Sequence, residues 1–217
     1  MYRLYQSLLA SAAMTVLAFP AFADYKLTIL HTNDVHSRIE EVNKADVTCS
    51  AKDSAAGECF GGVARLKTVI DAERAKADNV LVLDAGDQFQ GSLFFTTYQG
   101  IDNAEFMNAI GYDAMALGNH EFDRGQEGLA PFLDKITLPV LAANIETADT
   151  SPIHGKYRPY LIKTVGSEKI GIIGLITPDT VEIARPGKDI HFLDPKTTLE
   201  NIIRGPTIIV KIKHKLA

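Results

Sequence analysis

Residues 80–87 read Val-Leu-Val-Leu-Asp-Ala-Gly-Asp, and the fold prediction starts from this stretch. A continuous apolar run is typical of a buried strand, and here it ends at carboxylates. Two other apolar runs, residues 26–30 and 114–117, also lead into polar clusters. Gly86 and Gly118, within these clusters, leave room for tight turns and close backbone approach. Because sites in parallel sheets form beyond the carboxyl ends of strands, the three clusters are expected to converge.

The remaining apolar patterns alternate strands with helices. Helical spacing predicts helices over residues 63–70, 101–110 and 129–136, and short apolar runs predict strands over residues 26–30, 80–83, 114–117, 140–143, 160–165 and 169–176. Gly111 is expected to end the second helix, and Gly166-Ser167 to turn a hairpin between the last two strands. This alternation predicts an α/β fold with a mainly parallel sheet.

The polar clusters carry side chains that suit divalent metal ions. Asp34 and His36 stand two residues apart, so both can face one ion. Asp87 has two oxygens that can bridge two ions, and Asn119 offers a neutral carbonyl oxygen. Carboxylate and imidazole together bind zinc, manganese or iron, and two such ions can activate a water and hold phosphate oxygens. Taken singly, each residue also fits a plainer reading: turn residues for the first three, and a helix cap for Asn119.

The order and wording of these clusters resemble a known family. D-x-H, then G-D, then G-N-H-E-x-D is similar to the calcineurin-like metallophosphoesterases, and the fuller text resembles their exported bacterial 5'-nucleotidases from about Leu27 to about Leu199. The segments that carry the resemblance are His31–Asp34, Gly61–Arg65, Gly86–Ser92, Gly118–Asp123 and Gly174–Thr180. It implies the calcineurin-like metallophosphoesterase fold, a layered β-sandwich flanked by helices.

The resemblance also assigns a metal site. Asp34 and His36 match ligands of a first ion, and Asp87 matches a carboxylate that bridges two ions. Asn119 matches a ligand of the second ion that also touches the substrate phosphate. The implied cofactors are therefore two divalent metal ions, zinc, manganese or similar.

Two further residues match a catalytic pair. His120 corresponds to the histidine that stabilises the phosphoryl transition state or protonates the leaving oxygen, and Asp123 to the carboxylate that orients it. A carboxylate beside a histidine raises the pKa of the imidazole and fixes its tautomer. Read alone, His120 would fit a satisfied surface histidine.

The neighbouring polar residues receive plainer interpretations. Glu121 is expected to be solvated or structural rather than a ligand, and Asn144 to lie in a loop near the site. Asp84 and His31, at strand ends, are expected to be buried or to support the ligands from behind. For the remaining histidines of the folded part, His154 and His191, a surface position is expected.

The first 23 residues read as a secretory signal peptide. Arg3 is followed by the mostly apolar stretch Leu8–Phe19 and by Ala21-Phe22-Ala23, after which cleavage is expected. The alternative is a membrane anchor, but the run is short for a span of roughly 20 residues. Export would place the protein in the periplasm or outside the cell, with no stable membrane anchor. Removing Arg3 takes the formal net charge from −5 to −5 − 1 = −6, which gives no general attraction for nucleic acid polymers.

Cys49 and Cys59 are the only cysteines of the chain. An oxidising compartment favours a disulfide between them, with free thiols as the alternative and a metal site as a weaker one. The closed loop would stabilise the fold by about 3 kcal/mol.

The sequence departs from the family after residue 200. Members continue with a G-H and a G-H-x-H segment whose histidines complete both metal sites, and neither segment occurs here. His214, in a lysine-rich stretch, is a poor match for a ligand. We therefore expect a signal peptide over residues 1–23, part of a metallophosphoesterase domain over 24–200 and an unmatched basic tail over 201–217. Such a domain would be incomplete at its C-terminus, with missing ligands and an exposed edge or apolar face.

The resemblance implies hydrolysis of 5'-nucleotides outside the cytoplasm, in nucleotide catabolism, by direct attack of an activated water without a covalent intermediate. The partner is then a small nucleotide or phosphoester. Three alternatives stay open: a 2',3'-cyclic-nucleotide phosphodiesterase, a nucleotide-sugar pyrophosphatase, and a truncated metal-binding fragment without activity. Native metal, preferred ester and oligomeric state are not indicated by the sequence.

Overall fold

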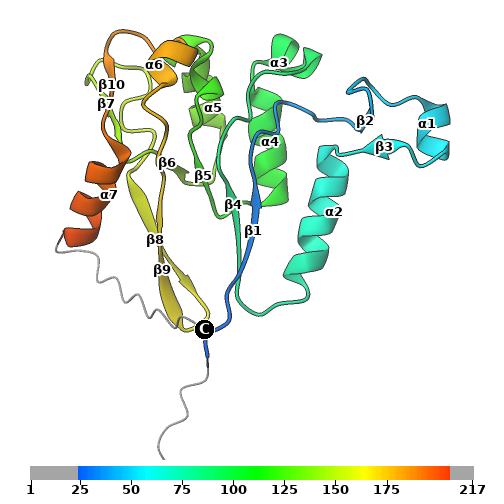
Figure 1. The fold of residues 1–217 in the computed structure, drawn as a ribbon, viewed down its shortest axis with the longest axis horizontal. Coiled ribbons are helices and arrows are strands. Elements are labelled where there is room, and N and C mark those ends of the chain that lie inside the picture. The colour runs from blue at the N-terminus through cyan, green and yellow to red at the C-terminus, as the bar shows by residue number, and fades with distance from the viewer. Residues whose placement is uncertain (1–23, 206–217) are drawn as a thin grey trace, which may run out of the picture.

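A computed structural model describes residues 24–205, and Figure 1 shows how its elements are arranged. The predicted signal peptide, and the predicted tail from residue 206 onward with His214, lie outside the described residues. The centre is a four-stranded parallel sheet in the order β1-β4-β5-β6. Its strands are β1 (Thr28–Thr32), β4 (Val80–Asp84), β5 (Ala114–Ala116) and β6 (Val140–Leu141). The predicted parallel α/β sheet is therefore confirmed.

The register of the sheet aligns the carboxyl ends of its strands. Thr32 at the end of β1 pairs with Asp84 at the end of β4, and Asp84 pairs in turn with Met115 of β5. The first strand was predicted two residues too early. The loops that follow β1, β4 and β5 consequently leave the sheet from the same edge, at the top of Figure 1.

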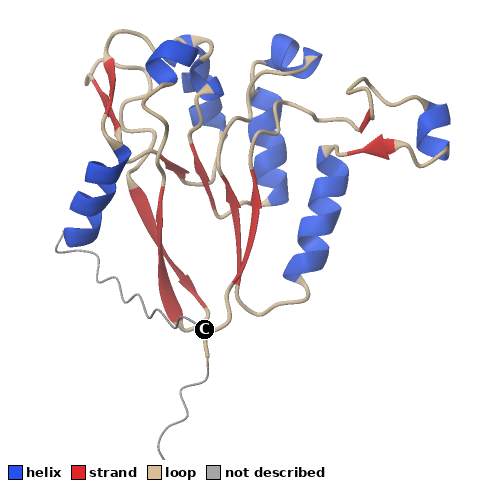
Figure 2. Ribbon diagram, in the orientation of Figure 1, coloured by secondary structure: helices blue, strands red, loops and turns tan. Residues whose placement is uncertain are grey.

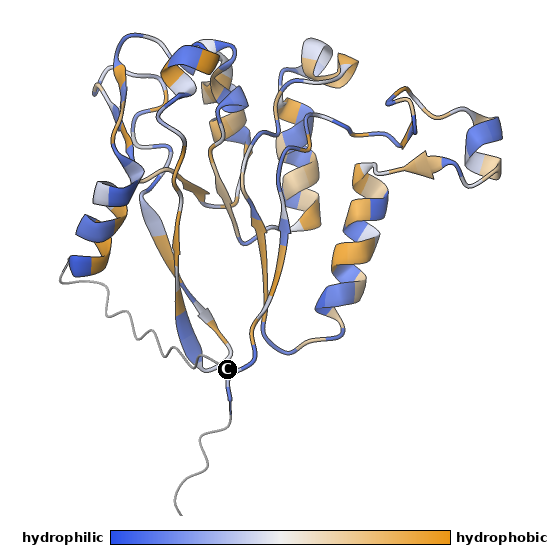
Figure 3. Cartoon of the chain, in the orientation of Figure 1, coloured by the Kyte–Doolittle hydropathy of each residue, from blue (hydrophilic) through white to orange (hydrophobic). Residues whose placement is uncertain are grey.

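Helices pack against the sheet and form the core with it. The longer ones are α2 (Val63–Arg74), α4 (Ile101–Ile110) and α5 (Gly125–Lys135). The apolar cluster joins strand residues such as Val82 and Met115 to Met107 of α4 and Phe132 of α5. In Figure 3 the central strands are largely orange while the helices carry both colours, as amphipathic helices against a buried sheet require.

Helix α4 ends at Gly111, as the sequence predicts. Gly111 adopts φ 78°, and its N–H bonds to the carbonyl of Met107, which is the left-handed glycine cap. Helix α5 begins at Gly125, four residues before the predicted start, and it contains Pro131. The proline and two glycines in this helix weaken its sequence signal.

Short elements complete the chain, and Figure 2 distinguishes the helices from the strands. They are β2 (Val42–Asn43), α1 (Ala51–Ala55), β3 (Cys59–Phe60), α3 (Leu93–Tyr98), the 3-10 turn η1 (His120–Phe122), β7 (Ile145–Thr147), β8 (Tyr160–Val165), β9 (Glu168–Ile173), α6 (Thr180–Ile183), β10 (Ile190–Phe192) and α7 (Pro195–Arg204). The predicted hairpin is β8–β9, which is antiparallel. It joins the β6 side of the sheet through a parallel bridge between Leu141 and Arg158. The other short elements were not predicted.

Cys49 and Cys59 form a disulfide with a Cα–Cα distance of 5.9 Å, the pairing that the sequence favoured. Glu41 lies within reach of both sulfur atoms, but a disulfide leaves no thiolate for a metal ion. The described residues include no helix long and apolar enough to cross a membrane.

Part of the apolar surface is uncovered in the described residues. Strand β1 ends the sheet, and its Ile29 is 52% exposed. On the hairpin, Ile162 is 41% exposed, and α7 has no buried residue. Strand β1 is thus an exposed edge strand of the sheet within the described residues.

Candidate metal and phosphoester site

Backbone hydrogen bonds join the loop after β1 to the loop after β4. Asp34 N donates to Gly86 O at 3.0 Å, and His36 N donates to Asp87 O at 3.1 Å. Ser37 continues the series with the carbonyl of Gln88 at 2.9 Å. This ladder carries the parallel pairing of β1 and β4 beyond the sheet, and it sets the first two ligand candidates beside the third.

Two glycines let the loops after β4 and β5 approach each other. A Cβ on Gly86 would lie 2.3 Å from Gly118 N, and a Cβ on Gly118 would lie 2.3 Å from Asp87 Oδ1. Real Cβ atoms do not come so close to other atoms, so any side chain at either position would push the loops apart. The predicted role of these glycines in close backbone approach is confirmed.

Three ligand candidates have left-handed backbone conformations. The φ angles are 52° for Asp34, 50° for His36 and 57° for Asp87. Non-glycine residues rarely occupy this region, and where they do the surrounding structure must hold them there. The ladder of backbone bonds supplies that constraint, and it aims all three side chains toward the same place.

Glu121 holds the loops together from below. Its side chain is fully buried and accepts four backbone N–H bonds: from Asp87 at 2.9 Å, Gln88 at 2.7 Å, Phe89 at 3.3 Å and Gly118 at 2.7 Å. Burial raises the pKa of this carboxyl, and the backbone N–H donors oppose that rise. Of the two expectations for Glu121, the structural one is confirmed and the solvated one is wrong.

The side chains of His36, Asp87 and His120 meet in one place. Each offers a ligand atom, and these atoms lie within 4.8 Å of one another. Asp34 joins them, because its Oδ1 lies 3.5 Å from His36 Nε2. Asn119 directly precedes His120 and is half-buried, and its backbone carbonyl accepts from Phe122 N at 3.0 Å. The three predicted clusters therefore converge as expected.

Hydrogen bonds set the state of the ligand side chains. His36 Nδ1 lies 3.0 Å from Phe89 O; because a carbonyl only accepts, the proton of the neutral ring lies on Nδ1, which leaves Nε2 as the nitrogen that could bind a metal ion. A hydrogen bond from Asn33 lowers the pKa of Asp34, and His36 lowers it further. Ionised carboxylates and a neutral imidazole with a free Nε2 are the donors that zinc or manganese requires, so the residues fit a divalent metal ion.

His120 and Asp123 form the expected pair. His120 Nδ1 lies 2.7 Å from Asp123 Oδ2, and Gln90 Nε2 donates to the same oxygen at 3.0 Å. Partial burial lowers the pKa of His120, but the hydrogen bond and charge of Asp123, with the charges of Asp87 and Glu121, raise it by more. His120 N also donates to Asp87 Oδ1 at 2.9 Å, which fixes the pair relative to the cluster.

Asp84 supports the site from within the sheet. It accepts from Thr32 Oγ1 at 2.6 Å, Gly86 N at 3.0 Å and Gln88 Nε2 at 2.8 Å. Burial raises the pKa of Asp84 to about 7, although these donors lower it. The expectation of a buried supporting carboxylate is confirmed for Asp84. It is wrong for His31, which is exposed because it lies on the uncovered side of the edge strand.

Asn144 lies in the turn between β6 and β7, as expected of a loop residue, and its buried side chain acts as a cross-link. Its Nδ2 donates to Ile176 O at 2.8 Å and to Leu193 O at 3.0 Å, while Ile176 N donates to its Oδ1 at 3.0 Å. His154 and His191 are exposed, as expected.

Sequence reasoning missed three contributors to the site. Glu121 was assigned no task, although its place inside G-N-H-E-x-D could have suggested one. The carbonyl of Phe89 and the amide of Gln90 carried no signal, because a backbone oxygen and a long exposed side chain are not recognisable in sequence. Their roles depend on the path of the loop after β4.

Comparison with known proteins agrees with this geometry. A family model described as calcineurin-like phosphoesterase matches residues 27–209. The chain belongs to the calcineurin-like phosphoesterase family. The parallel sheet with metal-ligand candidates at its carboxyl edge is that family's fold in this chain.

Named relatives point to one group of phosphoesterases. The 5'-nucleotidase of Bos taurus is 49% identical over 191 residues, which cover 87% of this chain and 33% of that protein. The 5'-nucleotidase of Homo sapiens is 47% identical over 191 residues, with the same two coverages of 87% and 33%. The chain thus spans about a third of the length of the curated relatives that it matches.

Solved structures give the same result. The 5'-nucleotidase precursor from Thermus thermophilus has a TM-score of 0.73 and 44% identity, covering 82% of this chain and 34% of that chain. The NAD nucleotidase of Haemophilus influenzae has a TM-score of 0.72 and 38% identity, covering 81% of this chain and 31% of that chain.

Proposed function

We propose that this chain is the metal-binding part of an exported phosphoric monoester hydrolase that acts on 5'-nucleotides. The observation that carries the proposal is the His120–Asp123 pair, held beside the converged side chains of Asp34, His36 and Asp87. The identity of about half of the aligned residues with 5'-nucleotidases supports it. The description of the Thermus thermophilus relative as a precursor, with the sequence pattern of residues 1–23, supports export.

The cluster divides into ligands for two divalent ions, zinc, manganese or similar. Asp34 and His36 would hold the first ion, Asp87 would bridge, and Asn119 would reach the second ion and the substrate phosphate. When bound, such ions neutralise phosphate charge and lower the pKa of water, so that hydroxide is present at neutral pH.

The catalytic pair supplies and orients a proton. Asp123 accepts the Nδ1–H of His120, so the opposite nitrogen, Nε2, faces away from the pair. The pKa of His120 is raised because the hydrogen bond and charge of Asp123 outweigh the effect of burial, and this favours a proton on Nε2. Nε2 then donates to the phosphoryl group in the transition state and protonates the leaving oxygen, a role that contributes typically about 100- to 10,000-fold to rate.

A second candidate is hydrolysis of a nucleotide pyrophosphate. The similarity to a structure named as an NAD nucleotidase favours it. The cyclic-nucleotide phosphodiesterase alternative has no observation of its own. The remaining alternative, a metal-binding fragment without turnover, is decided by the experiment below.

The test uses the full chain and its His120→Asn variant. Two tightly bound ions by calorimetry, with hydrolysis of p-nitrophenyl phosphate or AMP, would support the hydrolase, whereas one weak ion and no turnover would support the fragment. In His120→Asn we expect metal binding to be retained and turnover to fall by about 100- to 10,000-fold. Full activity in the variant would refute the role of His120 as proton donor. Loss of metal binding would show that His120 is a metal ligand instead.

A further inference from the structure

A cavity of about 930 Å³ opens beside His120. Its walls come from α3, from the turn after η1 and from the end of α6. His120 and Asp123 line the cavity, whereas Asp34, His36 and Asp87 do not. In an in-line displacement at phosphorus, attack from the side of those three residues expels the leaving group toward His120, so the leaving group would enter this cavity.

The charges in the cavity favour an anion. Arg124 and Arg185 line it, with Glu182 as the one opposing charge besides Asp123. The Asp123 carboxylate is already engaged by His120 and Gln90. Within residues 24–205, neither guanidinium forms an ion pair. Two guanidinium groups against one free carboxylate leave a surplus positive charge beside the catalytic pair.

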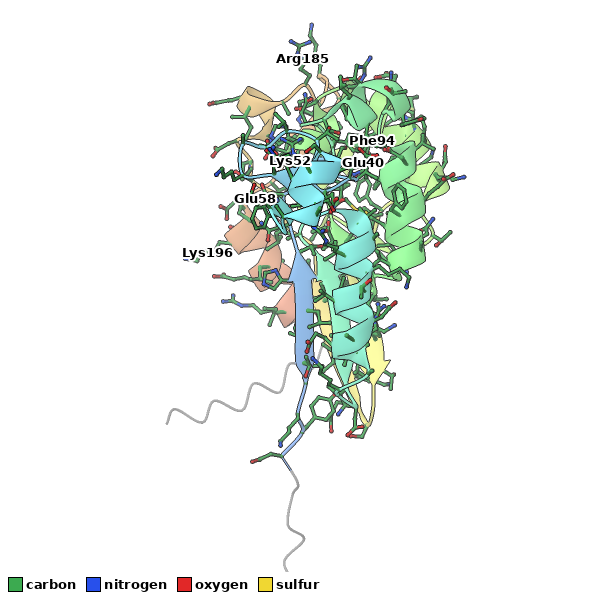
Figure 4. The ribbon with its side chains drawn as sticks, turned by 90° about the vertical axis from the view of Figure 1, so that its right-hand side faces the viewer. Glu40, Lys52, Glu58, Phe94, Arg185 and Lys196 are labelled. Atoms are coloured by element: carbon green, nitrogen blue, oxygen red, sulfur yellow. A yellow bond between two sulfur atoms is a disulfide. The ribbon has the colours of Figure 1, made fainter. Side chains whose placement is uncertain are left out.

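The backbones that carry both arginines are fixed next to that pair. Arg124 packs its stem on Gly128, where an added Cβ would lie 2.4 Å from Arg124 Cβ. Arg185 N donates to Phe122 O at 3.2 Å, which ties the end of α6 to η1. Figure 4 shows the Arg185 side chain extending outward at the top of the molecule, the edge where the site lies. Both side chains are exposed, so they are free to close on a ligand.

We propose that Arg124 and Arg185 form a subsite for a second phosphate, on the leaving-group side of the scissile bond. This inference rests on the proposed function and adds nucleotides with a terminal phosphoanhydride, such as a nucleoside diphosphate, to the monoesters proposed there. The leaving group of a monophosphate is a neutral nucleoside, which gives two arginines nothing to bind. A leaving phosphate, in contrast, matches the guanidinium fork in charge and geometry.

The reaction is a hydrolysis with water as the only co-reactant. The oxygen of water forms a bond to the terminal phosphorus, and the bond from that phosphorus to the bridging oxygen breaks. The electron pair of the broken bond stays on the bridging oxygen, which takes the proton of His120 Nε2. The proton lost by the attacking water passes to the solvent, and His120 regains a proton from the solvent. The products are inorganic phosphate and a nucleoside monophosphate, and the latter's phosphate lies between Arg124 and Arg185.

The test measures binding rather than turnover. Calorimetry on the full chain with Mn²⁺ would compare adenosine 5'-(α,β-methylene)diphosphate with the non-hydrolysable phosphonate analogue of AMP. We expect the diphosphate to bind at least about tenfold more tightly, and Arg124→Gln or Arg185→Gln to remove most of that preference without changing affinity for the monophosphate analogue. Glu182→Gln should increase the preference. Lys196→Gln, on α7 away from the cavity (Figure 4), is a control with the same change in charge.

The outcomes separate this inference from the proposed function. Equal affinity for the two ligands, or a preference that survives both arginine substitutions, would overturn the subsite and leave the monoester hydrolase standing. Binding of Mn²⁺ but of neither nucleotide analogue would overturn both. An equal loss in Lys196→Gln would show that the net charge of the protein, and not the two arginines, sets the preference, and this too would overturn the subsite.

Discussion

Among residues 24–205, two pairs of histidines have carboxylates around them, and one of these pairs meets Asp87 in a group that could hold a metal ion. His36 and His120 are half-buried, with ring centroids 4.9 Å apart. His154 and His191 line a different cavity of about 690 Å³, together with the carboxylates of Glu146 and Asp189. The residue types are alike in the two regions, so composition does not explain the difference.

What differs is how the side chains are held. At the site, the carbonyl of Phe89 and the carboxylate of Asp123 orient the two rings at 3.0 Å and 2.7 Å. In the other region, His154 Nδ1 lies 3.3 Å from Thr147 Oγ1 and its Nε2 lies 3.7 Å from Asp149, which is almost fully exposed. Ligand groups thus become a site when buried backbone and second partners fix their direction. Three predictions test this difference, ordered from the largest expected effect.

Asp87→Ala should remove metal binding altogether. The substitution deletes the carboxylate that lies between the other ligand candidates, and it also frees His120 N, which now bonds to Asp87 Oδ1 at 2.9 Å. Calorimetric titration with Zn²⁺ or Mn²⁺ would measure the loss. His191→Ala is the matched control from the other region and should bind metal like the unchanged chain. Unaltered metal content in Asp87→Ala would defeat the bridging assignment.

Much of this comparison could be read from the sequence, because it depends on residue order. Apolar runs followed by Asp34, Asp87 and Asn119 were sufficient to predict parallel strands with a shared edge. The same reasoning could not distinguish Glu121 from a solvated glutamate, since its four bonds come from separated backbone stretches. A local sequence pattern indicates which residues end a strand. It does not indicate which buried side chain accepts hydrogen bonds from the backbone N–H groups that the loops leave unpaired.

The short elements were missed for a related reason. Strands of two or three residues, such as β2 and β7, carry too few positions to show a period. Helix α7 runs from Pro195 to Arg204 and was not predicted, because it crosses residue 200, where the sequence was divided into a domain and a tail. The cross-linking role of Asn144 was not predicted, because its partners, Ile176 and Leu193, are distant in sequence.

Gly118→Ala should weaken metal binding by on the order of 100-fold and destabilise the fold by about 2 kcal/mol. The new methyl would lie 2.3 Å from Asp87 Oδ1 and 2.6 Å from Asp87 N, so the loops after β4 and β5 must separate. Gly171→Ala in β9 is the control, because a Cβ there meets nothing within 4 Å. Chemical denaturation and metal titration of both variants would measure the two effects. Native-like metal affinity in Gly118→Ala would show that close approach of the loops is not needed.

Asp84→Asn should alter how stability depends on pH, which is the smallest effect of the three. The folded-state pKa of Asp84 is raised from 3.8 to about 7, mainly by burial. The folded protein therefore binds more protons than the unfolded chain between about pH 4 and pH 7, and its free energy of unfolding falls as pH rises through that window. Glu121 and His120 also have raised pKa values and act in the same direction. The variant should flatten this fall in part.

Urea unfolding of the metal-free chain at several values between about pH 4 and pH 8 would measure the slope. The informative quantity is the slope of the free energy of unfolding against pH, compared between the variant and the unchanged chain. The absolute free energy is not informative, because the asparagine also loses a hydrogen bond to one of the donors from Thr32, Gly86 or Gln88 and so lowers stability at every pH. Asp149→Asn, at the exposed histidine of the other region, should leave the slope unchanged. An identical slope in Asp84→Asn would mean that Asp84 is ionised in the folded protein across this range. The pH dependence of the free energy of unfolding would then come from Glu121 and His120 and not from Asp84.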